Sequence, residues 1–362
     1  MITKLDWYIL KKFFVTFIFC MLLFTVIAVA IDTSEKTDDF VKSGLSTSEI
    51  IKQYYIGFIP WIWGLLYPLF VFIAVIFFTS KMALRSEVIA ILASGVTYNR
   101  WLRPYVIAGI TFAIVLWFSN AYWIPKANVI RGNFQAVYVD YVDPNHSGAR
   151  DNYYRRLDAS TYVGMKNYDT VSKTATAFFL EKVKNNKIIY NLRAQSIIWD
   201  SARHNWKLYS VVERNVDSMK ETVTQLNTLT LDIPLKPDEL KKDEYLKDKL
   251  TTTQLDKYIR TEEQRGTEGL NALKVEKFRR TATPFTVLLL SLIGAIIAAR
   301  KTRGGSGLHL AIGIGIAAIF IVSDKFSTVF SVKGNLPPLL AAWIPNIVFS
   351  FVAYYFYRTA PK

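Results

Sequence analysis

The sequence is poor in the residues on which most enzyme sites depend. Its one cysteine, Cys20, excludes an intrachain disulfide and a cysteine-based metal site. The three histidines, His146, His204 and His309, are scattered, and the long apolar runs hold essentially no acid. A membrane enzyme would need such groups clustered within its spans. We therefore predict that the chain is not an enzyme and holds no metal ion or cofactor of its own.

A nucleotide-binding P-loop is also missing. No stretch matches G-x-x-x-x-G-K-[ST], and the glycine-rich segment Gly304–Gly307 lacks the lysine and follows no predicted strand. The chain therefore cannot be a motor, and any ATP that drives it must be bound by a partner.

Long runs without charge are what the sequence has instead. A helix needs about 17–25 residues to cross a bilayer core, and a charge at its centre costs about 2.5–3.5 kcal/mol. Six uncharged runs are close to this length, and they predict six transmembrane helices. The runs are Phe13–Ile31, Tyr54–Ser80, Tyr105–Pro125, Thr281–Ala299, Gly304–Ser323 and Gly334–Tyr357.

The first run has a second interpretation. Lys11 and Lys12, an apolar stretch and the small residues 28–30 resemble a cleaved signal peptide. The stretch is longer than a usual signal core and rich in phenylalanine, which favours a retained helix. In either case the residues after it lie outside the cytoplasm.

The distribution of basic residues predicts the orientation. Twelve basic residues flank one set of span ends, and five lie in the short loops at the other. The first set is Lys4, Lys11, Lys12, Lys81, Arg85, Arg100, Arg103, Arg300, Lys301, Arg303, Arg358 and Lys362, and the second is Lys36, Lys42, Lys52, Lys325 and Lys333. The positive-inside rule then places both termini in the cytoplasm. Much of the net charge of +15 comes from the basic residues that flank the spans, and the rest forms no basic stripe. Nucleic acid is therefore not a predicted partner.

Residues 126–237 read as a β-rich domain outside the cytoplasm. Strand candidates are Ala175–Val183, Lys187–Trp199, Trp206–Val212 and Thr228–Leu235. Their spacing favours a sandwich, a jelly roll or an open barrel. Leu229, Leu231, Ile233 and Leu235 share one face, either as plain core or as the wall of an acyl-chain groove.

Residues 238–280 read as a helical connector. Thr253–Asp256 resembles a capping box, and Pro284 suits an early position of the fourth span. The predicted fold is thus an α-helical membrane protein with six transmembrane helices and a periplasmic all-β, jellyroll-like domain between helices 3 and 4. Residues 1–125 hold the first three spans and residues 281–362 the last three.

A short amphipathic segment separates the second and third spans. As a helix over 83–96 it has Leu84, Val88, Ile91, Leu92 and Gly95 on one side. The other side is small and polar and carries Glu87. Such a helix either docks into a partner protein or lies at the interface as a simple connector.

Three stretches make the chain similar to the lipopolysaccharide export permease family (LptF/LptG, also YjgP/YjgQ). Arg85–Val88 with Ala93–Gly95 resembles the family's cytoplasmic coupling helix. Pro284–Gly305 resembles its fourth span and the basic, glycine-containing loop that follows. Gly334–Pro338 with Ala342–Asn346 resembles its last span. The resemblance covers essentially the whole chain.

This resemblance implies partners and a substrate. Two such permeases pair as a heterodimer on a cytoplasmic ABC ATPase dimer in the inner membrane of a Gram-negative bacterium. The complex extracts lipopolysaccharide, and the jellyroll domain passes it to a periplasmic bridge protein. Glu87 would contact the ATPase, with Arg85, Ser94 and Gly95 in the same coupling segment.

An anionic glycolipid needs cations at the height of its phosphates. Lys36, Lys42, Lys325 and Lys333 lie near predicted outer span ends and are candidate lipid-binding residues. Lysines at such positions also serve simply to anchor a helix in the interface.

Two other functions remain as alternatives. One is the permease of another ABC-type lipid or lipoprotein exporter, although lipoprotein-releasing and macrolide-export permeases carry their outer domain after the first span. The other is a membrane receptor with a periplasmic ligand domain, for which the sequence offers no cytoplasmic output domain.

Overall fold

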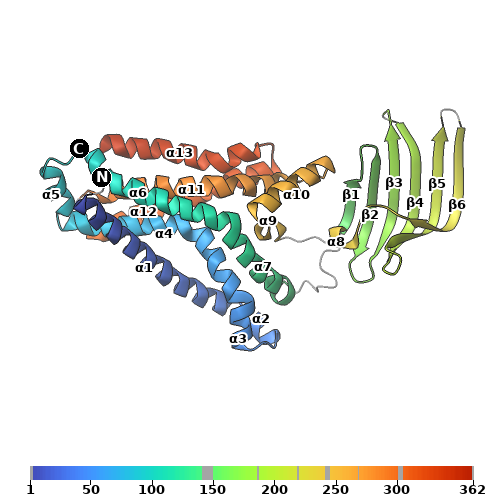
Figure 1. The fold of residues 1–362 in the computed structure, drawn as a ribbon, viewed down its shortest axis with the longest axis horizontal. Coiled ribbons are helices and arrows are strands. Elements are labelled where there is room, and N and C mark those ends of the chain that lie inside the picture. The colour runs from blue at the N-terminus through green and yellow to red at the C-terminus, as the bar shows by residue number, and fades with distance from the viewer. Residues whose placement is uncertain are drawn as a thin grey trace. The chain divides into compact units, whose positions relative to one another are not determined.

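The chain folds into two compact units, one of helices and one built around a β-sheet (Figure 1). The computed structural model describes residues 3–140, 150–185, 187–217, 220–240, 245–267, 269–300 and 305–360. The helical unit comprises Met1–Arg131, Lys247–Asp256 and Asn271–Lys362. The sheet unit comprises Gly132–Leu246 and Lys257–Leu270.

Six helices among the described residues are long and apolar enough to cross a membrane. Their central segments are α1 (Lys4–Glu35), α4 (Ile56–Leu84), α6 (Tyr98–Phe118), α11 (Asn271–Ala298), α12 (Gly305–Lys333) and α13 (Pro338–Thr359). Each contains most of one predicted run, which confirms the six spans.

Short elements extend or connect these spans. After α1 come α2 (Thr37–Lys42), α3 (Thr47–Ile50) and the π-helical turn η1 (Ile51–Tyr55), which runs into α4. The helix of the third span continues through η2 (Ser119–Trp123), α7 (Ile124–Phe134) and η3 (Gln135–Val139). The prediction that the β domain begins at residue 126 is therefore wrong, because apolar and helix-compatible residues continue past Pro125.

Local capping fixes where several of these helices begin. The Thr3 side chain caps α1 by accepting from the Asp6 backbone N–H, and the Asp6 carboxylate in turn accepts from the Thr3 backbone N–H. Thr97 caps α6. Such bonds satisfy backbone N–H groups that the first turn leaves unpaired. Pro60 and Pro68 both lie inside α4 without ending it.

The helix α11 forms the centre of the helical unit. It packs against α4, α6, α12 and α13. In its most apolar stretch 72% of residues are buried, against 11% in α1 and 17% in α12. The two outer helices therefore keep apolar faces that only lipid or another protein can cover.

A buried polar contact joins α11 to α13. The Thr286 hydroxyl donates to Asn346 Oδ1 at 2.8 Å, and Asn346 Nδ2 donates to the Ala282 carbonyl at 3.0 Å. Asn346 is 2% exposed, so both ends of its amide are satisfied inside the bundle. Small, polar contacts of this kind fix the register of helices that have no hydrophobic reason to associate in lipid.

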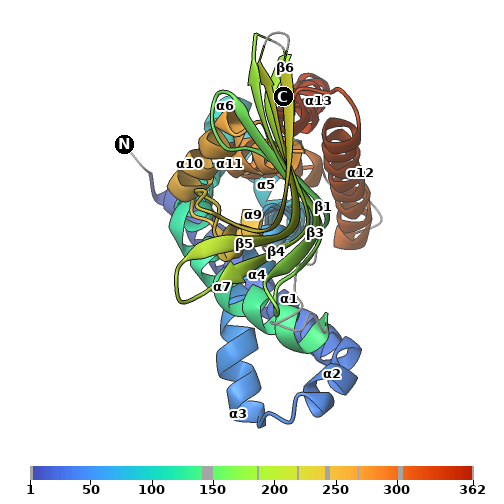
Figure 2. The same ribbon diagram turned by 90° about the vertical axis from the view of Figure 1, so that its right-hand side faces the viewer.

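The sheet unit contains one six-stranded antiparallel sheet among its described residues. Its strands are β1 (Arg150–Arg156), β2 (Thr161–Asp169), β3 (Thr174–Lys184), β4 (Lys187–Asp200), β5 (Asn205–Asp217) and β6 (Lys220–Leu231). Each strand pairs with the next along the chain, and Figure 2 shows their strong twist. The register sets Ile197 opposite Leu208 and Leu208 opposite Leu229, within one apolar cluster. The β insert is thus confirmed, and its described strands form a meander of one sheet; the jellyroll-like topology stays a prediction.

Strand prediction succeeded for the last four strands of this sheet and failed for the first two. The four candidates overlap β3, β4, β5 and β6, although β6 ends at Leu231 rather than at Leu235. The strands β1 and β2 were missed, because arginine, asparagine and aspartate interrupt their apolar alternation. Leu235 is fully buried, and Leu229, Leu231 and Ile233 pack against the same cluster.

The connector is helical where the structure describes it. It contains α8 (Pro237–Leu240), α9 (Leu246–Lys249) and α10 (Thr252–Gln264). The capping pair of α10 is Thr251 with Gln254, whose side chains and backbone N–H groups bond reciprocally, and not Thr253 with Asp256. Within the sheet unit, Arg155 of β1 pairs with Glu262 of α10 at 3.1 Å, and both are largely buried.

Gly57 permits a close approach between α4 and α7. A Cβ atom at this position would lie 2.5 Å from the Ala127 carbonyl oxygen and 2.6 Å from the Arg131 nitrogen. Both are backbone atoms, so neither can turn away. We expect Gly57→Ala to lower the free energy of unfolding by about 1–3 kcal/mol, the usual range for overpacking.

Thermal unfolding of the purified protein in detergent measures this effect. Gly315→Ala is the matched control, because nothing lies within 4 Å of a Cβ added to that exposed helical glycine. An equal loss in both variants would show that helix–helix spacing at Gly57 is not the cause.

Candidate functional site

The segment between the second and third spans is a short helix between two tight turns. The helix α4 ends at Leu84, Ser86 has φ +61°, and α5 (Glu87–Ala93) follows. Gly95, with φ +89°, ends the segment before α6 begins. The helix predicted over 83–96 is therefore shorter, because left-handed backbone at Ser86 and Gly95 interrupts it on both sides.

The helix α5 is seated on the bundle by its apolar side. Val88 is fully buried, and Ile91 and Leu92 pack against the same apolar cluster, as predicted. Leu84 differs from the prediction, since its side chain remains exposed. Ile89 points outward and is half exposed, which leaves an apolar residue on the free side of α5.

Glu87 is held by the first span. Its Oε2 accepts a hydrogen bond from the Tyr8 hydroxyl at 2.9 Å and lies 3.4 Å from Lys12 Nζ. Arg85 Nη1 lies 4.0 Å from Glu87 Oε1, and the Arg85 side chain is 61% exposed. The Glu87 side chain itself is 26% exposed, so a partner can still reach it.

The other two predicted coupling residues shape the end of α5. The Ser94 hydroxyl donates to the Ile91 carbonyl at 2.7 Å and so satisfies one of the last helical acceptors. Gly95 supplies the left-handed backbone that reverses the chain. A direct contact of Ser94 or Gly95 with a partner stays a prediction.

Further contacts gather five helices at the same end of the bundle. Asp6 of α1 accepts two hydrogen bonds from Arg100 of α6, at 2.6 and 2.7 Å. Tyr357 of α13 donates to Asn99 of α6, and Arg300, just after α11, donates to the Thr359 carbonyl. We call this region, with α5, the α5 end.

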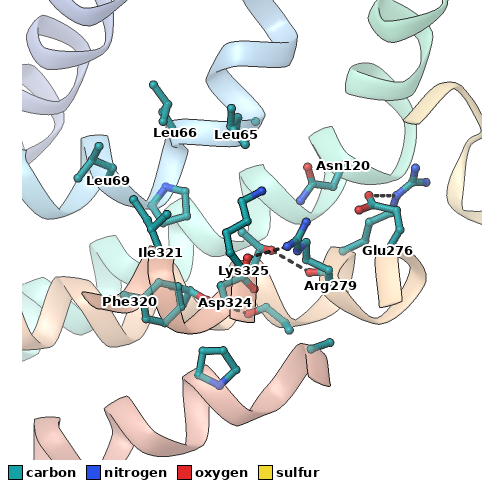
Figure 3. A pocket seen from close by; sticks show the side chains of 18 of the residues that line it. Leu65, Leu66, Leu69, Asn120, Glu276, Arg279, Phe320, Ile321, Asp324 and Lys325 are labelled. Atoms are coloured by element: carbon teal, nitrogen blue, oxygen red, sulfur yellow. Dashed lines mark hydrogen bonds and ion pairs between the residues drawn. The ribbon is translucent and has the colours of Figure 1, made fainter. Parts of the chain in front are cut away.

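A cavity of about 390 Å³ opens among the spanning helices. Its wall is mainly apolar and includes Trp61, Leu65, Leu66, Leu69, Phe320 and Ile321 (Figure 3). Polar side chains enter it from α11 and α12 and from η2. A mostly apolar wall with a few convergent polar groups is typical of a ligand pocket.

Charged side chains lie together in this cavity. Arg279 Nη2 donates to Asp324 Oδ2 at 2.6 Å, which links α11 to α12 (Figure 3). Glu276 accepts from Arg280, whose guanidinium also donates to the Leu250 and Lys247 carbonyls. Lys325 lines the cavity beside Asp324, and the described residues offer its ammonium no hydrogen-bond or ion-pair partner.

Lys325 is the one predicted lipid-binding lysine among the residues that line this cavity. The Lys36 ammonium instead bonds Asp32 Oδ1 at 2.6 Å and the Tyr54 hydroxyl, at the far end of α1. Lys42 lies in the last turn of α2, and Lys333 is the exposed last residue of α12. The lipid-binding role of all four stays a prediction.

Sequence reasoning missed Arg279, Asp324 and Glu276. Arg279 and Glu276 were assigned to a helical connector before the fourth span, and Asp324 directly follows the run that ends at Ser323. A signal was present, because ionisable residues at span ends that face a bundle interior often mark a substrate path. The facing direction, however, is a property of the folded helices.

The architecture defines a multi-pass helical membrane protein with an inserted β domain. The sequence model of one family, described as lipopolysaccharide export system permease LptF/LptG, matches residues 7–359. The chain belongs to this family, a transport component, as its three resembling stretches predicted. A comparison with curated proteins finds no match.

The Arg279–Asp324 pair predicts a specific coupling of stabilities. Arg279→Gln leaves the Asp324 carboxylate without its cation, and we expect the free energy of unfolding to fall by up to about 1 kcal/mol, because both side chains are about a quarter exposed. Adding Asp324→Asn should recover part of this loss, because two neutral amides leave no unpaired charge.

Thermal unfolding of both single variants and the double variant measures the coupling. Arg103→Gln is the control, since that arginine is exposed and does not line the cavity. Strictly additive losses would mean that Arg279 and Asp324 do not stabilise each other.

Proposed function

We propose that this chain is one permease subunit of an ATP-driven lipopolysaccharide exporter in the inner membrane of a Gram-negative bacterium. It takes the glycolipid from the membrane through the spanning helices and passes it, by way of the β domain, to a periplasmic bridge protein. The energy comes from a cytoplasmic ABC ATPase dimer, so the chain itself needs no cofactor. A second permease of the same family completes the path.

The distribution of charge supports an orientation with both termini in the cytoplasm. Nine of the twelve predicted cytoplasmic basic residues are described, and they flank the α5 end; Lys301, Arg303 and Lys362 lie outside the described residues. Positively charged flanks stay on the cytoplasmic side. This orientation puts α5 in the cytoplasm and the insert between α7 and α11 in the periplasm.

The positions of Glu87 and Ile89 on α5 are the main support for an ATPase that docks at this helix. One is an accessible carboxylate and the other an exposed apolar side chain, on a helix whose opposite side is anchored in the bundle. A helix-in-groove contact uses such a pairing of apolar and charged anchors. Because α5 is packed on the bundle between α4 and α6, a push on it reaches the second and third spans.

The size of the cavity supports a second permease. About 390 Å³ is near the lower end of the range of ~300–1,000 Å³ found for small-molecule pockets. A glycolipid with several acyl chains needs more room than this. The exposed apolar faces of α1 and α12 offer a surface for a second subunit, which can enclose the part of the glycolipid that this cavity does not hold.

Charge reversal on α5 tests the coupling role. Glu87→Arg should abolish lipopolysaccharide export, because a partner's cation would then meet a like charge, while membrane insertion and protein level remain normal. Export is measured by complementation in cells depleted of the native permease, with insertion checked by fractionation.

Glu35→Arg is the control, since Glu35 is an exposed acid at the opposite end of α1. Normal export in Glu87→Arg would contradict the proposed docking of an ATPase at α5.

Neutralising Lys325 tests the cavity as a lipid site. An ammonium–phosphate contact is worth about 1.5–3 kcal/mol, so Lys325→Gln should weaken binding of purified lipopolysaccharide about tenfold or more. Binding is measured on the permease in nanodiscs. Lys126→Gln, at an exposed lysine of α7 that does not line the cavity, should bind normally. Equal loss in both variants would count against this cavity.

A further inference from the structure

The contact between α1 and α5 points to a step that precedes docking. We propose that Tyr8 and Lys12 form a latch that holds Glu87 in the unoccupied permease, and that docking of the ATPase must open this latch. The inference rests on the proposed function, because it concerns the same carboxylate. It adds two positioning residues on the first span, and it makes α1 part of the coupling device.

The two latch residues compete directly with any incoming cation. Both the Tyr8 hydroxyl and Lys12 Nζ contact Oε2 of Glu87. A partner arginine binds a carboxylate best through both oxygens at once. The bidentate contact therefore requires Oε2 to be released by α1.

The latch is accessible and can open. The side chains of Lys12 and Glu87 are 32% and 26% exposed, so water and a partner both reach the pair. Ion pairs at this exposure contribute little to stability. A new contact with the ATPase can therefore replace the contacts of Glu87 with Tyr8 and Lys12 at little loss of stability.

The backbone around α5 allows it to move once it is released. Left-handed residues flank it at Ser86 and Gly95, and the helix between them has seven residues. Meanwhile Asp6 keeps the start of α1 attached to Arg100 of α6. Opening the latch thus removes one restraint on α5 from α1, without releasing α1 from the bundle.

The expected signature is a gain of affinity when the latch is removed. If part of the permease population is latched, the apparent dissociation constant for the ATPase equals the intrinsic constant divided by the fraction that can dock. Tyr8→Phe removes the hydroxyl without changing charge, and Lys12→Met removes the ammonium. Each should tighten ATPase binding about two- to tenfold.

A variant cycle on the permease pair in nanodiscs tests this expectation. ATPase affinity is measured for Tyr8→Phe, Lys12→Met and the control Lys11→Met, each alone and together with Glu87→Gln. Lys11 is an exposed neighbour with the same charge that does not contact Glu87 among the described residues. The latch is supported if ATPase affinity rises in Tyr8→Phe and Lys12→Met but not in Lys11→Met. Neither latch variant should raise the affinity in the Glu87→Gln background.

Failure of the latch and failure of the docking role are distinguishable. If Glu87→Gln weakens ATPase binding but Tyr8→Phe does not raise the affinity, the latch is overturned and the docking role of Glu87 stands. Glu87→Gln that leaves affinity unchanged overturns the docking role, and the latch with it.

The mobility of α5 gives a readout that does not involve the ATPase. A nitroxide label at Ile89→Cys, in a Cys20→Ser background, reports the motion of α5 in the permease alone. Tyr8→Phe and Lys12→Met should increase that motion relative to Lys11→Met. Equal mobility in all three variants would overturn the proposal.

Discussion

The absence of hydrogen-bonding solvent in the bilayer core is the constraint on which the rest of this structure depends. Every backbone N–H and C=O group there must be paired within the protein, so each span is helical. Left-handed backbone at Ser86 and Gly95 is confined to the α5 end, between spans. The short helix α5 therefore lies in a connection between spans, where water can satisfy its backbone groups.

The same constraint explains which side chains join the helices. Apolar contacts give little specificity between helices in lipid, so register depends on close packing and on polar pairs. Gly57 supplies close packing against α7, and Thr286 with Asn346 supplies a satisfied polar pair. Arg279 with Asp324 is a third device, but it lies in a cavity wall, where a charged ligand can also reach it.

The spans and the β insert could be predicted because their signals are local. A bilayer sets the length of each uncharged run, and alternation of apolar residues marks β3 to β6. Lys36 shows a local signal that was overlooked, since Asp32 lies four residues earlier on the same helical face. Shared faces on one helix follow from spacing alone. The strand β2, in contrast, acquires its place by pairing with β3, and β1 by pairing with β2.

The environment of Glu87 could not be predicted in this way. Tyr8 lies 79 residues from Glu87 along the chain, and Asp324 lies 45 residues from Arg279. No local periodicity encodes such pairs, because they depend on how α1 crosses the α4–α6 connection and how α11 packs on α12. The sequence predicted that Glu87 on α5 contacts a partner protein. It did not predict that Tyr8 and Lys12 of the same chain already bind this carboxylate, so that its access to a partner depends on these contacts. If an ATPase docks at α5 as proposed, Glu87 serves as acceptor first for α1 and then for the ATPase, and it is suited to report whether the ATPase is bound.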